Sequence, residues 1–169
     1  MSVQTTYRQS NLSWMEADTE QLHERARALT GLEFIRGMID DSVPRPPVAQ
    51  ALGIEVVEVE PGTVTFRLTP APYMTNHLGI VAGGILATAL DAALGCAVLT
   101  TLPLDRDIVT LDLSLDFLAP VRSNGGPVSF VARTVHLGSR RALAHGEVLD
   151  DSGKLCATGR SGCLVTPKR

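Results

Sequence analysis

Residues 73–104 read YMTNHLGIVAGGILATALDAALGCAVLTTLPL, and this stretch is the strongest indication of the fold. From Leu78 to Leu104 every side chain is apolar, small or a threonine, with the exception of Asp91. A run of about 18 apolar residues can span a membrane. The central carboxylate, the Ala, Gly and Thr content and the polar strands on both sides favour a buried helix of a globular protein instead. We expect this helix to begin near Gly83 and Gly84.

The segments around this helix predict strands. Residues 54–68 read as a hairpin with Pro61-Gly62 as its turn. In residues 108–121 strict alternation predicts a strand with one packed face and one polar face. Its apolar side chains are Val109, Leu111, Leu113, Leu115 and Phe117, and its polar ones are Thr110, Asp112, Ser114 and Asp116. Three more strands follow over 127–138, 141–150 and 154–165, and their hairpin-length connections predict an antiparallel sheet.

The N-terminal part of the chain predicts an extension to this domain. Residues 1–14 are polar and are expected to be frayed, and residues 20–41 show helical spacing that Gly31 and Gly37 weaken, so one helix or two shorter ones fit. The prolines of residues 44–50 then break the helix. We expect a helical extension over residues 1–46 and, over residues 47–169, an α+β domain whose antiparallel sheet wraps around the long helix.

Composition excludes some classes of partner. The chain has 169 residues with a formal net charge of −3, so it lacks the basic surface of a nucleic-acid-binding protein. Aromatic residues make up only 4%, which argues against a base-stacking platform. The three cysteines, Cys96, Cys156 and Cys163, lack metal-ligand spacing and are expected to be free thiols. With no signal pattern at the N-terminus, we expect a cytoplasmic protein without a bound metal.

Asp91 and the glycine pair suggest acyl-transfer chemistry. A lone carboxylate is costly to bury in an apolar helix, so Asp91 is either exposed by the packing or placed for chemistry. In the second case it could act as a general base or a nucleophile. The helix start at Gly83-Gly84 leaves unpaired N–H groups, which can stabilise a carbonyl oxygen that gains negative charge. Asn76 can donate and accept, so it could orient water or the acyl group.

The spacing of these groups predicts a site shared by two chains. Eight positions separate Gly83 from Asp91, which is about 12 Å along a helix axis. Catalytic partners need hydrogen-bond distances to one reacting centre. Two antiparallel copies of the helix could bring Asp91 of one subunit to Gly83 of the other, giving two equivalent sites at a two-fold interface.

Each of these features also has a purely structural explanation. A glycine pair at a helix start often serves close packing, and a lone Asp can bond a backbone group of the covering sheet. His77 fits a loop residue better than a base. Arg140 and Arg141 are typical of a solvated hairpin tip, although paired arginines also suit phosphates.

The stretch NHLGIVAGGILATALDAALG, residues 76–95, resembles the helix motif of the hotdog-fold acyl-CoA thioesterases of the phenylacetate-degradation (PaaI-like) family. The resemblance extends over roughly residues 47–165, and includes LGIEVVEVEPG, TLDLSLDFLAPV and GKLCATGR. It implies a hotdog fold and a homodimer that assembles further into a tetramer. The sequence departs from the motif at Ala82, where many relatives carry His.

The resemblance also implies roles for individual residues. Asp91 would activate water or attack the thioester, Gly83 would polarise its carbonyl with Gly84 supporting the turn, and Asn76 would position substrate or water. Thr110 occupies a hydroxyl position that assists the nucleophilic water in some relatives. For the substrate, the further candidates by resemblance are His77 beside the motif, then Gly138, Ser139 and Arg140 in a hairpin, with Arg160 as an additional cation.

The leading hypothesis is an acyl-CoA thioesterase that needs no cofactor, since coenzyme A is part of the substrate, and no nucleic acid or membrane. One alternative is a non-catalytic acyl-CoA binding or sensing module, which Ala82 makes conceivable. A hotdog hydratase or dehydratase fits less well, because the catalytic His motif of those enzymes is missing. The acyl group is left open; it depends on which of Leu86, Leu90, Leu94, Leu113 and Phe117 line the end of the tunnel.

Overall fold

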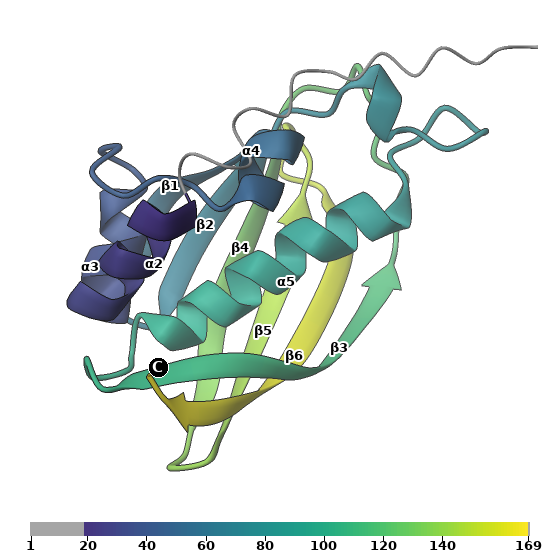
Figure 1. Ribbon diagram of the computed structural model, residues 1–169. Coiled ribbons are helices and arrows are strands. Elements are labelled where there is room, and N and C mark those ends of the chain that lie inside the picture. The colour runs from purple at the N-terminus through teal and green to yellow at the C-terminus, as the bar shows by residue number, and fades with distance from the viewer. Residues whose placement is uncertain (1–18, 169) are drawn as a thin grey trace, which may run out of the picture.

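The computed structural model describes residues 19–168, which form a six-stranded antiparallel sheet against one long helix (Figure 1). The order in the sheet is β1-β2-β4-β5-β6-β3. The strands are β1 (Ile54–Glu60), β2 (Thr63–Leu68), β3 (Arg106–Phe117), β4 (Val128–Leu137), β5 (Arg141–Leu149) and β6 (Leu155–Pro167). Two strands, the long helix α5 (Gly83–Leu99) and four strands follow in the predicted order, so the α+β hotdog architecture is confirmed.

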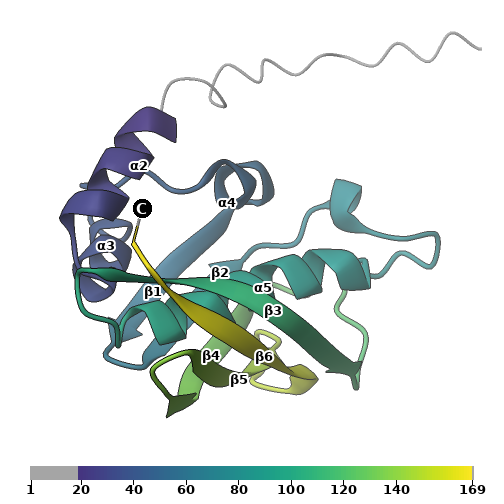
Figure 2. The ribbon, with the colours of Figure 1, turned by 60° about the horizontal axis from the view of Figure 1, so that its bottom comes forward.

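Helix α5 lies along one face of the curved sheet (Figures 1 and 2). Its sequence is rich in Ala and Leu, which are strong helix formers. Leu86, Leu90 and Leu94 are almost fully buried against the sheet. The helix ends at Thr100, whose hydroxyl donates to the carbonyl oxygen of Ala97 (2.7 Å) and accepts from the backbone N–H of Gly62 (2.8 Å). None of the helices between residues 19 and 168 is long and apolar enough to cross a membrane.

Two paired glycines let α5 approach the sheet closely. Gly146 of β5 and Gly159 of β6 are register partners. A Cβ at either position would lie 2.8 Å from a methyl group of Leu90. Because interiors are packed at crystal-like density, the Leu90 side chain fills the space that two side chains would otherwise occupy.

The N-terminal helices cover one end of α5. Helices α2 (Thr19–Ala28) and α3 (Gly31–Gly37) are separate, and Thr30 with Glu33 forms a capping box at the start of α3. A Cβ on Gly31 would collide with the carbonyl oxygen of Leu99, so α3 packs directly on the last turn of α5. The two-helix alternative is therefore the correct one. The fraying expected for residues 1–14 lies outside the described residues, and the boundary at residue 46 stays a prediction.

A short helix, α4 (Pro47–Leu52), forms where the prolines were expected only to end the preceding helix. Pro47 is its first residue, a position that tolerates proline because the missing N–H would be unpaired there anyway. Gly53 ends it with a left-handed backbone (φ 64°). Helices α3 and α4 both pack against β1.

Strand β3 departs from the expected alternation. A bulge between Thr110 and Asp112 shifts its register against β6. Leu113 and Leu115 pack on the core as expected, but Val109 and Leu111 are 55% and 52% exposed. The prediction that they share the packed face is wrong, because a bulge inserts one residue and changes which side chains face inward. Ile108 packs on the core and Thr110 turns toward α5.

Candidate active site

The first turn of α5 offers free backbone donors. The residue before it, Ala82, has extended backbone (ψ 135°) and caps the helix with no side-chain hydrogen bond. Its own N–H donates to the carbonyl oxygen of Met74 (2.9 Å). Within residues 19–168 the N–H groups of Gly83 and Gly84 have no hydrogen-bond acceptor. Such N–H groups, with the partial positive charge of the helix N-terminus, favour a developing negative charge.

An apolar groove of about 360 Å³ opens at this helix start. The N–H of Val81 donates to the carbonyl oxygen of Val121 (2.8 Å), which ties the segment before α5 to the segment after β3. The ring of Phe117 lies over Gly83, where a Cβ would be 2.9 Å from the ring edge. The lining residues are Asn76, Ile80, Val81, Gly83, Leu86, Phe117, Leu118, Ala119, Pro120 and Val121.

Asn76 lines this groove, and the oxygen of its side-chain amide accepts a hydrogen bond. Its side-chain oxygen accepts from the N–H of Leu78 (2.9 Å), and its backbone N–H donates to the carbonyl oxygen of Ile80 (2.8 Å). These bonds fix the loop and leave the side-chain NH₂ with no partner among the described residues. Asn76 and Gly83 therefore line the same groove and can both present donors to it.

Asp91 lies half-buried in the middle of α5 and is held by β3. Its Oδ1 accepts a hydrogen bond from the hydroxyl of Thr110 (3.2 Å). The bulge after Thr110 makes this contact possible. Without it, strand alternation would have placed Thr110 on the face of β3 that points away from Leu113, Leu115 and the core. Asp91 does not line the groove at Gly83. One chain thus brings together Asn76 with Gly83, and separately Asp91 with Thr110.

The cysteines near the carboxylate are poor nucleophiles. Burial, and to a smaller extent the negative charge of Asp91, raises the pKa of Cys96 to about 12. Burial is also the main cause of the raised pKa of Cys163, and the charge of Asp91 contributes there too. Burial is likewise the main cause of the raised pKa of Cys156. All three are free thiols, as predicted. Because the thiolate is the reactive form, the carboxylate is the better candidate for the chemistry at neutral pH.

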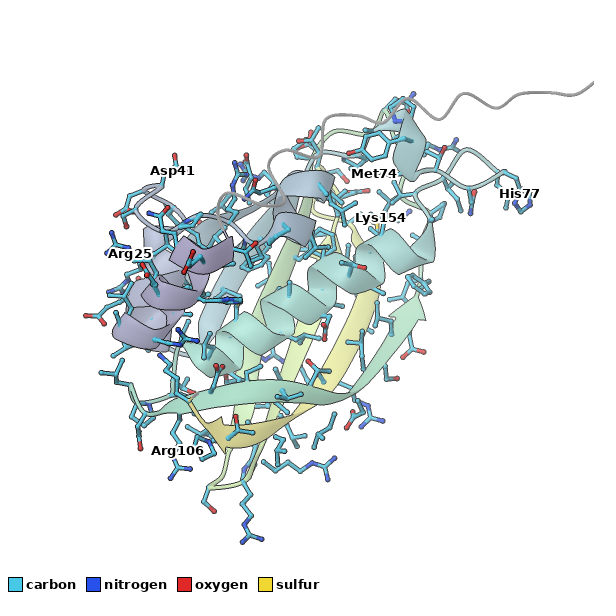
Figure 3. The ribbon with its side chains drawn as sticks, in the orientation of Figure 1. Arg25, Asp41, Met74, His77, Arg106 and Lys154 are labelled. Atoms are coloured by element: carbon cyan, nitrogen blue, oxygen red, sulfur yellow. The ribbon has the colours of Figure 1, made fainter. Side chains whose placement is uncertain are left out.

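The predicted substrate-binding residues are spread over the chain. His77 points away from the body at the exposed tip of its loop (Figure 3), and Gly84 is exposed on the first turn of α5. Gly138, Ser139 and Arg140 form the β4–β5 turn, which adjoins the start of β3 rather than its Phe117 end. Arg160 faces away from α5, because its neighbour Gly159 faces Leu90. A single chain does not bring these residues to the groove.

The sequence did not indicate all residues of the groove, and some of the leucines expected to line an acyl tunnel lie elsewhere. Of the leucines proposed to line a tunnel, Leu90 and Leu94 are fully buried against the sheet, while Leu86 lines the groove with Phe117. The segment 119–121 also lines the groove, but it was predicted as the end of a strand and not as part of a site. Its signal was available, since it follows directly on the strand that ends at Phe117 and contains a proline that ends strands.

Comparisons with known proteins identify the family and the fold of the chain. Residues 78–157 match the model of the thioesterase superfamily. The crystal structure of a phenylacetic acid degradation-related protein from Ralstonia eutropha JMP134 superposes with a TM-score of 0.70 at 30% identity, covering 77% of this chain and 98% of that one. The PaaI protein of Escherichia coli gives a TM-score of 0.68 at 21% identity, covering 85% and 94%.

One sequence relative has a name that states the reaction it catalyses. The 1,4-dihydroxy-2-naphthoyl-CoA hydrolase of Listeria monocytogenes is 23% identical over 120 residues, which is 71% of this chain and 96% of the relative. The matched region of the superfamily model contains Gly83, Asp91 and Thr110, and it ends within β6. The chain belongs to the thioesterase superfamily and has its hotdog fold.

Proposed function

We propose that this chain hydrolyses an acyl-CoA thioester to a free acid and coenzyme A. The observation that carries the proposal is the half-buried carboxylate of Asp91, held by Thr110, in the same helix whose N-terminus presents unpaired N–H groups to an apolar groove. The Listeria relative, named as a hydrolase of a CoA thioester, supports the reaction class.

In the proposed reaction each group has a defined role. Asp91 takes a proton from water while the water oxygen adds to the thioester carbon, or its carboxylate attacks that carbon directly. The N–H of Gly83 stabilises the oxygen that gains charge, and the NH₂ of Asn76 positions it. In the base route the C–S bond then breaks, and the thiolate of coenzyme A takes the proton that Asp91 accepted from water. In the nucleophile route the C–S bond breaks to leave an anhydride between the acyl group and Asp91; water then hydrolyses this anhydride, which releases the acid and supplies the proton for the thiolate. Bond exchange of this kind needs no redox cofactor, because no electrons are transferred.

The free edge of the sheet supports a site made from two chains. In the described residues β3 has a strand neighbour on one side only, and Val109, Leu111, Phe117 and Leu118 are exposed along it or just beyond it. An exposed apolar edge is a template for pairing with another chain. Antiparallel pairing of β3 with a second copy lays the Thr110 end of one strand beside the Phe117 end of the other. Asp91 of one subunit then approaches the groove at Gly83 of its partner.

The same pairing gives the β4–β5 turn a role. The turn residues Gly138, Ser139 and Arg140 lie near the start of β3, so antiparallel pairing moves them toward the groove of the partner subunit. Arg140 is a cation that can bind the phosphates of coenzyme A there. Assembly of such dimers into a tetramer remains part of this proposal.

A substrate panel tests the reaction class directly. We expect wild-type protein to release free coenzyme A from at least one aliphatic or aromatic acyl-CoA, detected with a thiol reagent. Binding of a thioether analogue without turnover of any thioester would favour the binding-module alternative. Hydration of crotonyl-CoA would favour the hydratase alternative. Single-turnover hydrolysis in heavy-oxygen water, followed by mass analysis of the protein, separates nucleophile from base.

Mixing two inactive variants tests whether the site is shared. Asp91→Asn removes the carboxylate and Gly83→Val blocks the N–H donor, so each homodimer should be inactive. A hybrid carries one intact site and one site with both defects. After subunit exchange of equal amounts, we expect roughly a quarter of wild-type activity.

The control for this mixing experiment is a chain that carries both substitutions. A hybrid between that chain and either single variant has no intact site and should stay inactive. Native mass spectrometry establishes that hybrids have formed. Formed hybrids without activity would show that Asp91 and Gly83 of one chain serve the same site.

A further inference from the structure

An ion pair on the face of the sheet opposite α5 joins β3 to β5 across the strand that lies between them. The Nη2 of Arg141 donates to Oδ2 of Asp112 over 3.3 Å. Neighbouring strands are about 4.7–4.9 Å apart, so side chains of β3 and β5 can meet only by lying over β6. At this point β6 carries Gly162, the register partner of Asp112. A Cβ on Gly162 would lie 2.5 Å from the same carboxylate oxygen, so the glycine leaves room for the pair.

The backbone of the β4–β5 turn is also held. The N–H of Gly138 donates to the carbonyl oxygen of Arg141 (2.8 Å), which closes the turn. The N–H of Val165 in β6 donates to the carbonyl oxygen of Arg140 (3.0 Å). The turn is therefore fixed to β6 by its backbone and to β3 by the side chain of Arg141, the first residue of β5. Strand β3 is the edge at which we place the second chain.

The two arginines of this turn differ in what they contact. The guanidinium of Arg141 is engaged by Asp112. The guanidinium of Arg140 is exposed and has no ion-pair or hydrogen-bond partner within residues 19–168. A planar guanidinium without a partner can bind a phosphate through two parallel hydrogen bonds. Arg140 is thus available to a ligand, and Arg141 is not.

We propose that Asp112 and Arg141 are positioning residues for coenzyme A. Their ion pair holds the β4–β5 turn against β3, so that Arg140 faces the phosphates at the groove of the partner subunit. The proposal rests on the coenzyme A substrate and the two-chain site proposed above, because these place the nucleotide end of the substrate beside the turn. Asp112 touches no substrate. As an anion near a phosphate site it opposes binding by its charge, and it favours binding through the position of Arg140.

The variant Asp112→Asn separates these two effects by the sign of the change. Loss of the anion alone should tighten the binding of coenzyme A, whereas loss of the positioning pair should weaken it. An exposed ion pair changes an equilibrium constant by up to about fivefold. We expect the Kd of coenzyme A, measured by titration calorimetry, to rise by about two- to fivefold. The KM of an acyl-CoA should rise with it, and kcat should not change.

Two further variants separate geometry from charge. Gly162→Ala keeps both charges but puts a methyl group where the carboxylate lies, so it should raise the Kd of coenzyme A by a similar factor. Arg141→Gln removes the other partner of the ion pair. If the two residues act as a pair, the double variant Asp112→Asn/Arg141→Gln should bind no more weakly than Arg141→Gln alone. If Gly162→Ala does not fold, Asp112→Asn carries the measurement, since Asn has the shape of Asp.

The matched control is Glu55→Gln. It breaks another exposed ion pair of the same length, the 3.3 Å contact between Arg45 and Glu55 on β1, at the opposite edge of the sheet. Its Kd for coenzyme A should equal that of wild type. A second control uses S-acetylpantetheine, which lacks the phosphates that Arg140 would bind. Its KM should be the same in wild type and in Asp112→Asn.

The outcomes separate this inference from the proposed function. Unchanged binding of coenzyme A by Asp112→Asn would mean that the pair is only solvated surface charge, and tighter binding would mean that its charge alone acts. Either result overturns the positioning role, as does an equal loss for S-acetylpantetheine. If wild type binds coenzyme A with the expected variant pattern but hydrolyses no thioester, the proposed function fails and the positioning pair stands. If wild type does not bind coenzyme A, both fail.

Discussion

Replacing Asp91 by Asn should lower the rate of thioester hydrolysis by about 10²–10⁴-fold, the contribution expected of a general acid–base group. Asn has the shape of Asp, and its side-chain oxygen can still accept the hydrogen bond that Thr110 donates. The variant should therefore fold like wild type, but it has no carboxylate to take a proton from water or to attack the thioester. The measurement is kcat for the acyl-CoA that wild type hydrolyses best.

Two further variants make the Asp91 result specific. Asp105→Asn is the same change at an exposed turn, where the carboxylate only pairs with Arg106, and it should leave kcat unchanged. Thr110→Val removes the hydrogen bond to Asp91; a bond to a charged group is worth about 1.5–3 kcal/mol, so we expect a loss of about 10–100-fold. Wild-type kcat in Asp91→Asn would contradict the proposed mechanism.

Adding a methyl group at Gly146 should be among the most destabilising small changes in the sheet. The new Cβ would lie 2.8 Å from a methyl group of Leu90 and 3.1 Å from the carbonyl oxygen of Val131. Overpacking of a core costs about 1–3 kcal/mol. Removing the other partner by Leu90→Ala leaves a cavity and costs about 2–5 kcal/mol.

The double variant tests whether these two sites are in contact. Leu90→Ala vacates the space that the Cβ at Gly146 needs. The double variant should therefore lose less unfolding free energy than the sum of the losses in the two single variants. Urea unfolding of wild type, both single variants and the double variant gives the interaction energy. Gly84→Ala is the control, since no atom lies within 4 Å of a Cβ there, and it should not be destabilised. Strict additivity would mean that Leu90 moves away from Gly146.

The architecture could be predicted because its determinants are local. The apolar run with one carboxylate predicts a covered helix, and strands with hairpin-length connections predict an antiparallel sheet. The helix does begin at Gly83, and Asp91 does lie in its middle. The N-terminal donors follow from that start, since any helix leaves its first N–H groups unpaired.

Two local features escaped prediction for opposite reasons. Helix α4 has only six residues, so helical periodicity cannot show in it, and its leading prolines dominate the pattern. The bulge in β3 interrupts a stretch whose alternation is the most regular in the sequence. Strand periodicity assumes an unbroken ladder, and nothing in the side chains alone marks the extra residue.

The order of the strands and of α5, the free N–H groups at Gly83 and the single carboxylate of α5 could all be predicted from local sequence. These depend on neighbours within a few positions along the chain. Three contacts could be known only from the packed structure: Thr110 bonds to Asp91, Phe117 covers Gly83, and Gly31 of α3 packs on Leu99 of α5. Each of these contacts joins residues far apart in sequence, and it depends on the bulge of β3 and on the packing of α3, which no local pattern specifies.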